Sequence, residues 1–239
     1  MSLSIGIVGL PNVGKSTLFN ALLKKQQALA ANYPFATIEP NVGIVPVPDA
    51  RLAKLAEVVA QSREHMDIVL GNKEGLTHTK LPPLVPATVT FVDIAGIVKG
   101  ASEGEGLGNK FLAHIREADA ICMVIRAFED ENVVMTGSGN PVDDREVLMT
   151  ELSLADLQTV SKQQSPKGSL TPEQKKRWEA ILKIQTVLNE GKRADEAGLD
   201  GDEKILVNDL CLMTMKPIIY VVNIDEAELS SVTCADLTL

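Results

Sequence analysis

The sequence has few cysteines, few aromatic residues and no long apolar run. Its three cysteines, Cys122, Cys211 and Cys234, are odd in number and widely spaced, a pattern that fits neither a disulfide framework nor a zinc ligand set. No apolar segment approaches the roughly 20 residues that span a bilayer, and residues 1–8 lack the basic flank of a secretory signal. We therefore expect reduced thiols, a cytoplasmic location and no membrane partner.

Positive charge is also scarce. The chain has 23 Lys and Arg against 32 Asp and Glu, a formal net charge of −9. A net-negative protein repels phosphate backbones unless its cations gather on one face, so we expect no sequence-specific DNA partner. Apolar residues, in contrast, make up 45% of the 239 residues, enough for a large core in one or two domains. We expect the protein to be a monomer.

Short β-branched apolar runs alternate with segments of helical periodicity. This alternation predicts an α/β fold, in which helices cover both faces of a mostly parallel sheet. Pro46 places the second run at a sheet edge, because proline cannot donate to a central ladder. The expected strands are 3–8, 42–47, 88–93, 121–126 and 218–223, and the expected helices between the first three are 14–27 and 51–62.

The stretch between the last two strands has a different character. Residues 141–164 and 171–190 both show helical periodicity, and Thr171, Pro172 and Gln174 form a capping box at the start of the second helix. We expect a helical hairpin at 139–203, inserted into an α/β domain made of 1–138 and 204–239, with a helix over 202–215 leading back to the sheet. Residues 71–86, which contain three prolines near their end, are predicted to form a surface excursion.

The strongest chemical signal is a phosphate-loop motif, Gly-Leu-Pro-Asn-Val-Gly-Lys-Ser-Thr at 9–17, between the first strand and the first helix. Its glycines let successive N–H groups converge on phosphate oxygens. Lys15 is placed to span the β- and γ-phosphates, and the Ser16 hydroxyl to bind Mg²⁺. The predicted nucleotide contacts are Asn12, Val13, Gly14, Lys15, Ser16 and Thr17.

Two further motifs supply oxygen ligands and a γ-phosphate contact. Asp93 ends a strand and could reach the magnesium through water, while the N–H of Gly96, three residues later, could sense the γ-phosphate. Thr37, in the irregular segment 33–41, is a candidate second hydroxyl on the metal. The predicted metal ligands are therefore Ser16, Thr37 and Asp93.

The last expected strand ends in a candidate base-reading motif that includes Asn223, Ile224 and Glu226. In guanine-specific relatives of this architecture, a lysine and an aspartate stand at the second and last of these positions. A carboxylate lengthened by one methylene misplaces its bonds to guanine, and each unpaired buried donor costs about 1–3 kcal/mol. We therefore expect strong guanine preference to be lost.

Taken together, these motifs resemble the YchF subfamily of Obg-related P-loop NTPases, the Obg-like ATPases, from residue 5 to about 226. The resemblance also rests on the blocks Tyr-Pro-Phe-Ala-Thr-Ile-Glu-Pro-Asn, Asp-Ile-Ala-Gly-Ile-Val-Lys-Gly-Ala, Gly-Glu-Gly-Leu-Gly-Asn-Lys-Phe-Leu and Arg-Ala-Phe-Glu-Asp. It implies a three-layer P-loop NTPase sandwich with a helical insertion, Mg²⁺-dependent ATP hydrolysis and ribosome association. The family normally continues through a last strand and helix of the nucleotide domain and a carboxy-terminal TGS domain. We expect this chain to lack these parts, so that its nucleotide domain is incomplete at the carboxy-terminal end.

The residue that orients the attacking water differs from that of many small GTPases. Many small GTPases carry a glutamine where this chain has Ile97, which cannot hydrogen-bond water. The resemblance implies His114 as a substitute, which glycines at 104–108 would allow to move. Its alternative is a helix-surface histidine with no catalytic task. Asn12 is a candidate K⁺ ligand, although capping of the loop by its amide is a simpler account.

Three functions remain open. The first is an Mg²⁺-dependent ATPase that acts as a ribosome-associated switch. The second is a GTPase, and the third is a nucleotide-responsive binding module with negligible turnover, which Ile97 would explain. Lys15 and His114 are the predicted catalytic residues.

Overall fold

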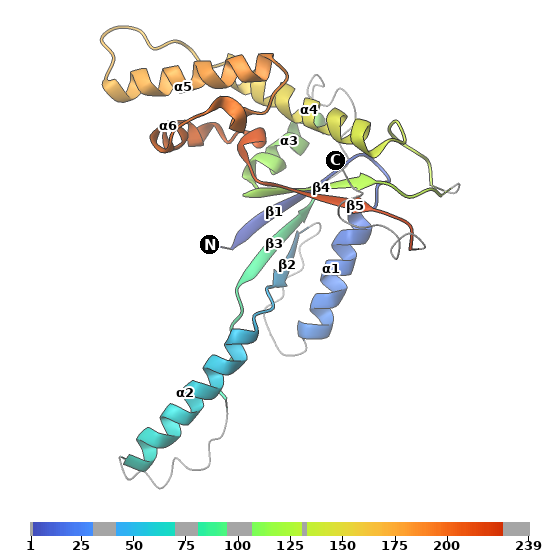
Figure 1. Cartoon of the computed structure of the whole chain (residues 1–239), viewed down its shortest axis with the longest axis vertical. Helices are drawn as coiled ribbons and strands as arrows, with labels where there is room; N and C mark the ends of the chain where they lie inside the picture. The colour runs from blue at the N-terminus through green and yellow to red at the C-terminus, as the bar shows by residue number, and fades with distance from the viewer. Residues whose placement is uncertain (1, 31–41, 70–80, 95–106, 131–132, 227–239) are drawn as a thin grey trace.

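The computed structural model describes residues 2–30, 42–69, 81–94, 107–130 and 133–226. Its strands form a sheet with helices packed around it (Figure 1). The strands are β1 (Leu3–Val8), β2 (Val42–Pro46), β3 (Thr88–Asp93), β4 (Ala120–Arg126) and β5 (Ile218–Asn223). The helices are α1 (Lys15–Ala30), α2 (Ala50–Val69), α3 (Leu107–Glu117), α4 (Pro141–Ser161), α5 (Pro172–Asn189) and α6 (Gly201–Val207).

The sheet has the strand order β2-β3-β1-β4-β5. β1, β3, β4 and β5 are parallel, whereas β2 pairs antiparallel with β3. The expected mostly parallel α/β sheet is therefore confirmed, and β2 with its Pro46 lies at an edge as predicted. Because parallel strands share one carboxyl edge, the ends of β1, β3, β4 and β5 meet there, and the predicted site motifs follow three of these strands.

β4 is the centre of the main core. Each of its seven residues is buried, which explains why its sequence is a continuous apolar run and not an alternating one. The core cluster extends from β1 and β4 to Leu112 and Ile115 on α3 and to Leu148 and Leu152 on α4. Helices α3 and α4 thus bury their apolar side chains against the sheet.

The inserted helices build a second apolar cluster, centred on Ile181 and Ile184 of α5 with Trp178 packed beside it. α5 begins as predicted, because the Thr171 side chain accepts a hydrogen bond from the N–H of Gln174, and the Gln174 side chain accepts one from the N–H of Thr171. The prediction of one helix over 202–215 is wrong. α6 ends at Val207, and two 3₁₀ turns follow, η3 (Asn208–Leu210) and η4 (Met213–Met215).

Two features prevent a continuous helix after α6. Cys211 adopts a left-handed conformation with φ of 47°, which interrupts helical hydrogen bonding. The buried carboxylate of Asp156 on α4 accepts the N–H groups of Met213 (2.9 Å) and Thr214 (2.7 Å). These N–H groups therefore bond to a distant side chain instead of to a preceding turn of helix, a choice that the local sequence does not indicate.

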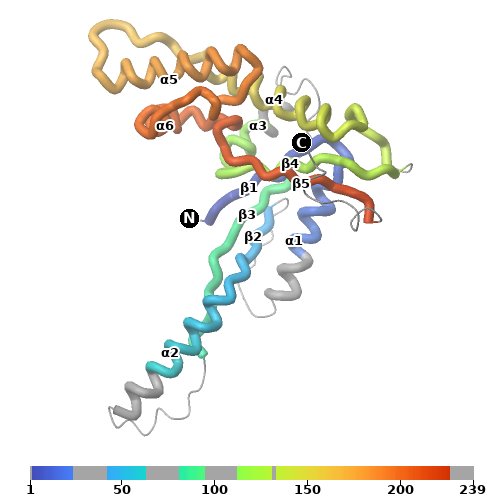
Figure 2. The backbone as a smooth tube through the Cα atoms, viewed as in Figure 1, coloured from blue at the N-terminus to red at the C-terminus, as the bar shows by residue number. Residues whose placement is uncertain are grey.

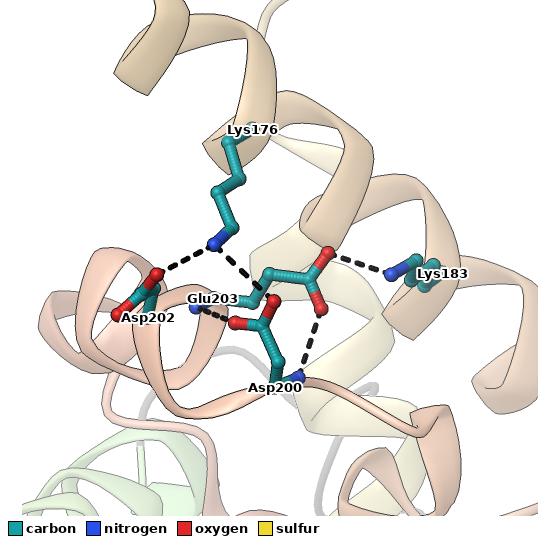
Figure 3. Close-up of polar contacts among 5 residues, drawn as sticks. All are labelled: Lys176, Lys183, Asp200, Asp202 and Glu203. Carbon is teal, nitrogen blue, oxygen red and sulfur yellow. Dashed lines mark hydrogen bonds and ion pairs between the residues drawn. The ribbon is translucent and has the colours of Figure 1, made fainter.

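Ion pairs hold α5 against the segment that contains α6 (Figure 3). Lys176 contacts Asp200 (3.2 Å) and Asp202 (2.8 Å). Lys183 donates to Glu203 (2.6 Å), whose other oxygen accepts the N–H of Asp200. These five side chains, which we call the α5–α6 clamp, join the end of the insertion to α5.

Helix α2 projects from one end of the sheet (Figures 1 and 2). Asp49 begins the helix by accepting the N–H of Arg51 through its carboxylate. The helix continues to Val69, past the predicted end at Ser62. Among the described residues, no helix combines the length and apolar character that crossing a membrane requires.

Candidate functional site

The phosphate loop joins β1 to α1 at the carboxyl edge of the sheet. Gly9 lies so close to β4 that a side chain there would clash with the carbonyl of Val124. Asn12 and Gly14 have positive φ angles of 62° and 98°, and the first turn of α1 carries no acidic side chain. No acidic side chain of α1 itself therefore neutralises the positive end of the helix that faces the loop. This arrangement favours a bound phosphate.

Lys15 is buried beneath this loop. Only 8% of the residue is exposed, and its Nζ donates to the carbonyl oxygen of Leu10 at 2.7 Å. Burial lowers the pKa of Lys15, and the nearby carboxylate of Asp93 partly opposes that effect. The ammonium is therefore held inside the curve of the loop, where a phosphate oxygen could replace the Leu10 carbonyl as acceptor or share the ammonium with it.

Two of the three predicted metal ligands meet in the structure. The Ser16 hydroxyl donates to the Asp93 carboxylate at 2.8 Å, although the two residues are 77 positions apart in the chain. β3 brings Asp93 beside Ile7 of β1 in the parallel register. A hydroxyl and a carboxylate are oxygen ligands that suit Mg²⁺, so this pair fits a metal that also binds phosphate oxygens.

The end of β5 closes the other side of the loop. Asn223 Nδ2 donates to the carbonyl of Val13 at 3.0 Å, and a side chain at Gly14 would clash with the same amide. Gly14 is therefore required both for its φ and for this close approach. Asn223, which the sequence predicts to read the base, thus holds the phosphate loop in the structure.

The loop after β4 lies against both parts of the site. Asn12 Nδ2 donates to the carbonyl of Val134 at 3.2 Å, and the Asp225 carboxylate accepts the N–H of Glu129 at 3.3 Å. The amide of Asn12 thus has a loop-holding role. These two bonds tie the β4 loop to the phosphate loop on one side and to the base-reading segment on the other.

Arg126, which sequence reasoning did not assign to the site, shapes that loop from inside. It is buried at the end of β4, donates to the carbonyls of Phe128, Asp130 and Val133, and places its guanidinium 4.2 Å from the centre of the Phe128 ring. The available signal was a cation at the end of a wholly apolar strand, since such a charge is rarely buried without partners.

Ile224 is half-buried and Glu226 is exposed at the end of the described chain. Thr37, Gly96 and Ile97 lie outside the described residues.

His114 lies on the outer surface of α3. Its side chain is 62% exposed, and Nδ1 is 4.0 Å from a Glu117 oxygen. None of the hydrogen bonds among the described residues joins it to the phosphate loop.

Comparison with known proteins gives concordant matches. Residues 4–159 match a family model described as "50S ribosome-binding GTPase". The chain is 46% identical over 235 residues to a protein of Bacillus subtilis named "Ribosome-binding ATPase YchF", covering 96% of this chain and 58% of that one. A protein of the same name from Escherichia coli O157:H7 is 44% identical over 95% of this chain and 58% of its own length.

A solved structure also matches. "Structure of the Schizosaccharomyces pombe YchF GTPase" superposes with a TM-score of 0.71 at 38% identity, covering 95% of this chain and 58% of that one. The chain therefore spans less than two thirds of the length of these relatives.

Proposed function

This chain belongs to the 50S ribosome-binding GTPase family, and on that premise we propose that it binds and hydrolyses ATP with Mg²⁺ as a nucleotide switch read by the ribosome. The observation that carries the proposal is the convergence of Lys15, Ser16 and Asp93 at one loop. A buried ammonium and an oxygen-ligand pair at a helix N-terminus supply the charge and positioning that phosphoryl transfer needs.

Each residue of the site has a distinct task in this proposal. Lys15 binds the β- and γ-phosphates, while Ser16 and Asp93 would hold Mg²⁺, together with Thr37. The metal, when bound, neutralises charge that develops on the phosphate oxygens. Main-chain amides of the loop orient the triphosphate, and Asn223 keeps that loop in place through the Val13 carbonyl.

The choice of purine rests on the segment after β5. The names of the relatives differ on this point: the bacterial proteins are called ATPases, and the Schizosaccharomyces pombe protein is called a GTPase. Ile224 and Glu226 stand where guanine-specific proteins have lysine and aspartate, so we propose that ATP is preferred. GTP hydrolysis is the alternative.

Competition against labelled ATP tests this choice. We expect unlabelled ATP to compete at least about tenfold better than GTP, because misplaced guanine donors cost over a kcal/mol. The double variant Ile224→Lys with Glu226→Asp should move the preference toward GTP. Equal competition by ATP and GTP in the unmodified protein would contradict the ATP preference that we infer from Glu226. Failure to bind either nucleotide would contradict the proposed function itself.

We also propose that His114 positions the attacking water. His114 is exposed in the structure and lies close to Glu117, so this role requires it to move toward the nucleotide. Phosphate release should fall at least about a hundredfold in His114→Ala, within the range for general acid–base groups, with ATP affinity unchanged. Unchanged release would reject the assignment, and no release from either protein would favour a binding module without turnover.

A further inference from the structure

The last turn of α3 carries an arginine that the nucleotide site does not use. Arg116 is half-buried, and its guanidinium donates to the Thr159 hydroxyl at 2.8 Å and to the Ala155 carbonyl at 3.3 Å. The Thr159 hydroxyl in turn donates to the same carbonyl at 3.0 Å. These three groups, which we call the α3–α4 latch, join α3 to the first helix of the insertion (Figure 1).

Arg116 and His114 lie on opposite sides of α3. Two residues along an α-helix are separated by about 200° around its axis. Arg116 stands four positions after Leu112, which is buried in the core, so these two residues share the inner face. His114 is on the outer face, with its side chain 62% exposed. A turn of α3 that carries His114 inward therefore carries Arg116 away from α4.

The latch consequently forms in only one of these two positions of α3. A bond that is present in one conformation and absent from the other shifts the equilibrium toward the first. Hydrogen bonds with a charged donor are stronger than neutral ones, and the bond from Arg116 to Thr159 is partly buried. Because the latch is formed in the structure while His114 faces outward, it favours the outward position.

The latch leaves one donor of Arg116 unpaired. Among the described residues, its Nε is buried and has no hydrogen-bond partner. A buried donor without an acceptor costs free energy, which offsets part of what the two bonds to α4 contribute. This cost lowers the net preference for the latched position and suits a contact that opens and closes.

We propose that Arg116 is a positioning residue that holds His114 away from the nucleotide while the α3–α4 latch is formed. Thr159 and Ala155 belong to α4, so a partner that displaces this helix opens the latch and lets His114 turn inward. The insertion thereby sets the rate of ATP hydrolysis. This inference rests on the proposed function, in which His114 positions the attacking water.

Arg116→Met tests the latch, because methionine keeps the apolar part of the side chain and removes its donors. Lys216 still binds the main-chain carbonyl of residue 116 in this variant. We expect kcat for phosphate release to rise at least about fivefold, at the lower end of coupling between sites, with KM for ATP unchanged. Thr159→Val removes the acceptor on α4 and should also raise kcat. Neither change should raise kcat in the His114→Ala background.

Arg177→Met is the matched control. Arg177 lies on α5 and donates to the Asp209 carboxylate at 3.0 Å, so the change removes an arginine contact within the insertion and leaves the latch intact. We expect its kcat to equal that of the wild type, and thermal unfolding checks that each variant keeps its fold. Where the wild type releases phosphate, an unchanged or lower kcat in both latch variants would overturn the proposal. An equal rise in the control, or a rise that persists without His114, would do the same.

A second readout does not depend on turnover. The ring signals of His114, assigned by their loss in His114→Ala, are followed by NMR during titration with Mg²⁺ and a non-hydrolysable ATP analogue. We expect the analogue to shift these signals further in Arg116→Met than in the wild type, and equal shifts would contradict the latch. A larger shift without phosphate release from any variant would support the latch and contradict the proposed hydrolysis. Failure of the analogue to bind would contradict the proposed function and, with it, this inference.

Discussion

At the scale of single residues, Asn223 connects three segments of the site. Its side chain donates to the Val13 carbonyl and occupies the space that the missing side chain of Gly14 leaves. Its own carbonyl accepts the N–H of Ala127 at 2.8 Å, at the start of the loop after β4. One residue thus links the phosphate loop, the base-reading segment and the loop that Arg126 shapes.

Asn223→Ala should therefore weaken nucleotide binding through the loss of support to the phosphate loop. The Val13 carbonyl loses its donor, and the loop loses the support beside Gly14. We expect ATP affinity to fall about tenfold, the equivalent of one net hydrogen bond of about 1.4 kcal/mol. Isothermal titration against Asn208→Ala, an exposed asparagine remote from the loop, provides the control, and equal affinities in both variants would contradict this role.

At the scale of elements, ion pairs on α5 differ in how far their carboxylates are exposed. Lys183 contacts Glu203, whose side chain is 6% exposed, whereas Lys175 on the same helix lies 3.9 Å from Glu179, which is 55% exposed. Hydrogen bonding to Lys183 is the main reason that the pKa of Glu203 is lowered. Water screens the exposed pair, so the two lysines should differ in effect.

Lys183→Met should lower the urea midpoint of unfolding clearly more than Lys175→Met does. A carboxyl group with a lowered pKa contributes stability above its unfolded pKa, and that contribution is lost as pH falls through its folded pKa. The difference between wild type and Lys183→Met should therefore be present at pH 7 and shrink toward pH 3. Equal midpoints for the two variants at pH 7 would show that the clamp does not stabilise the fold.

At the scale of the whole molecule, a buried polar network joins the two apolar cores. Asp156 on α4 accepts the hydroxyl of Thr214 (2.7 Å) in addition to the two backbone N–H groups of η4. The Thr214 oxygen in turn accepts the N–H of Ala194 (3.0 Å). Lys216, two residues after Thr214, donates to the carbonyls of Arg116 near the end of α3 and of Ala118 just beyond it. The insertion and the sheet therefore meet through bonds to residues 213–216.

Asp156 should make stability depend on pH in the opposite sense to Glu203. Burial raises the pKa of Asp156 despite the hydrogen bonds that it accepts, so the native state binds more protons than the unfolded state between the unfolded and folded values. The free energy of unfolding of the wild type should therefore fall, relative to Asp156→Asn, as pH rises from about 4 through the raised pKa. Urea unfolding at several pH values measures this, and a constant difference would contradict it.

Patterns among residues close together in the sequence were enough to locate most of the described helices and strands. The buried strands are nearly continuous apolar runs, the cap of α5 is a local Thr-Pro-Glu-Gln sequence, and the loop from Gly9 to Thr17 is a contiguous motif. Each of these depends on residues a few positions apart, so its geometry follows from neighbouring side chains. Such patterns did not indicate that α2 continues past Ser62 to Val69. The antiparallel pairing of β2 depends on where that strand meets β3.

Contacts between distant positions could not be read in the same way. The sequence alone predicted a phosphate-loop motif followed by carboxylate and amide motifs, because residue type and spacing define those groups. Folding decided that Ser16 meets Asp93, that Asn223 supports Val13 and that Asp156 ends the helix expected over 202–215. The physical reason is that a hydrogen bond needs its donor and acceptor within about 3 Å, and for residues so far apart in sequence only packing of the sheet and helices brings them together.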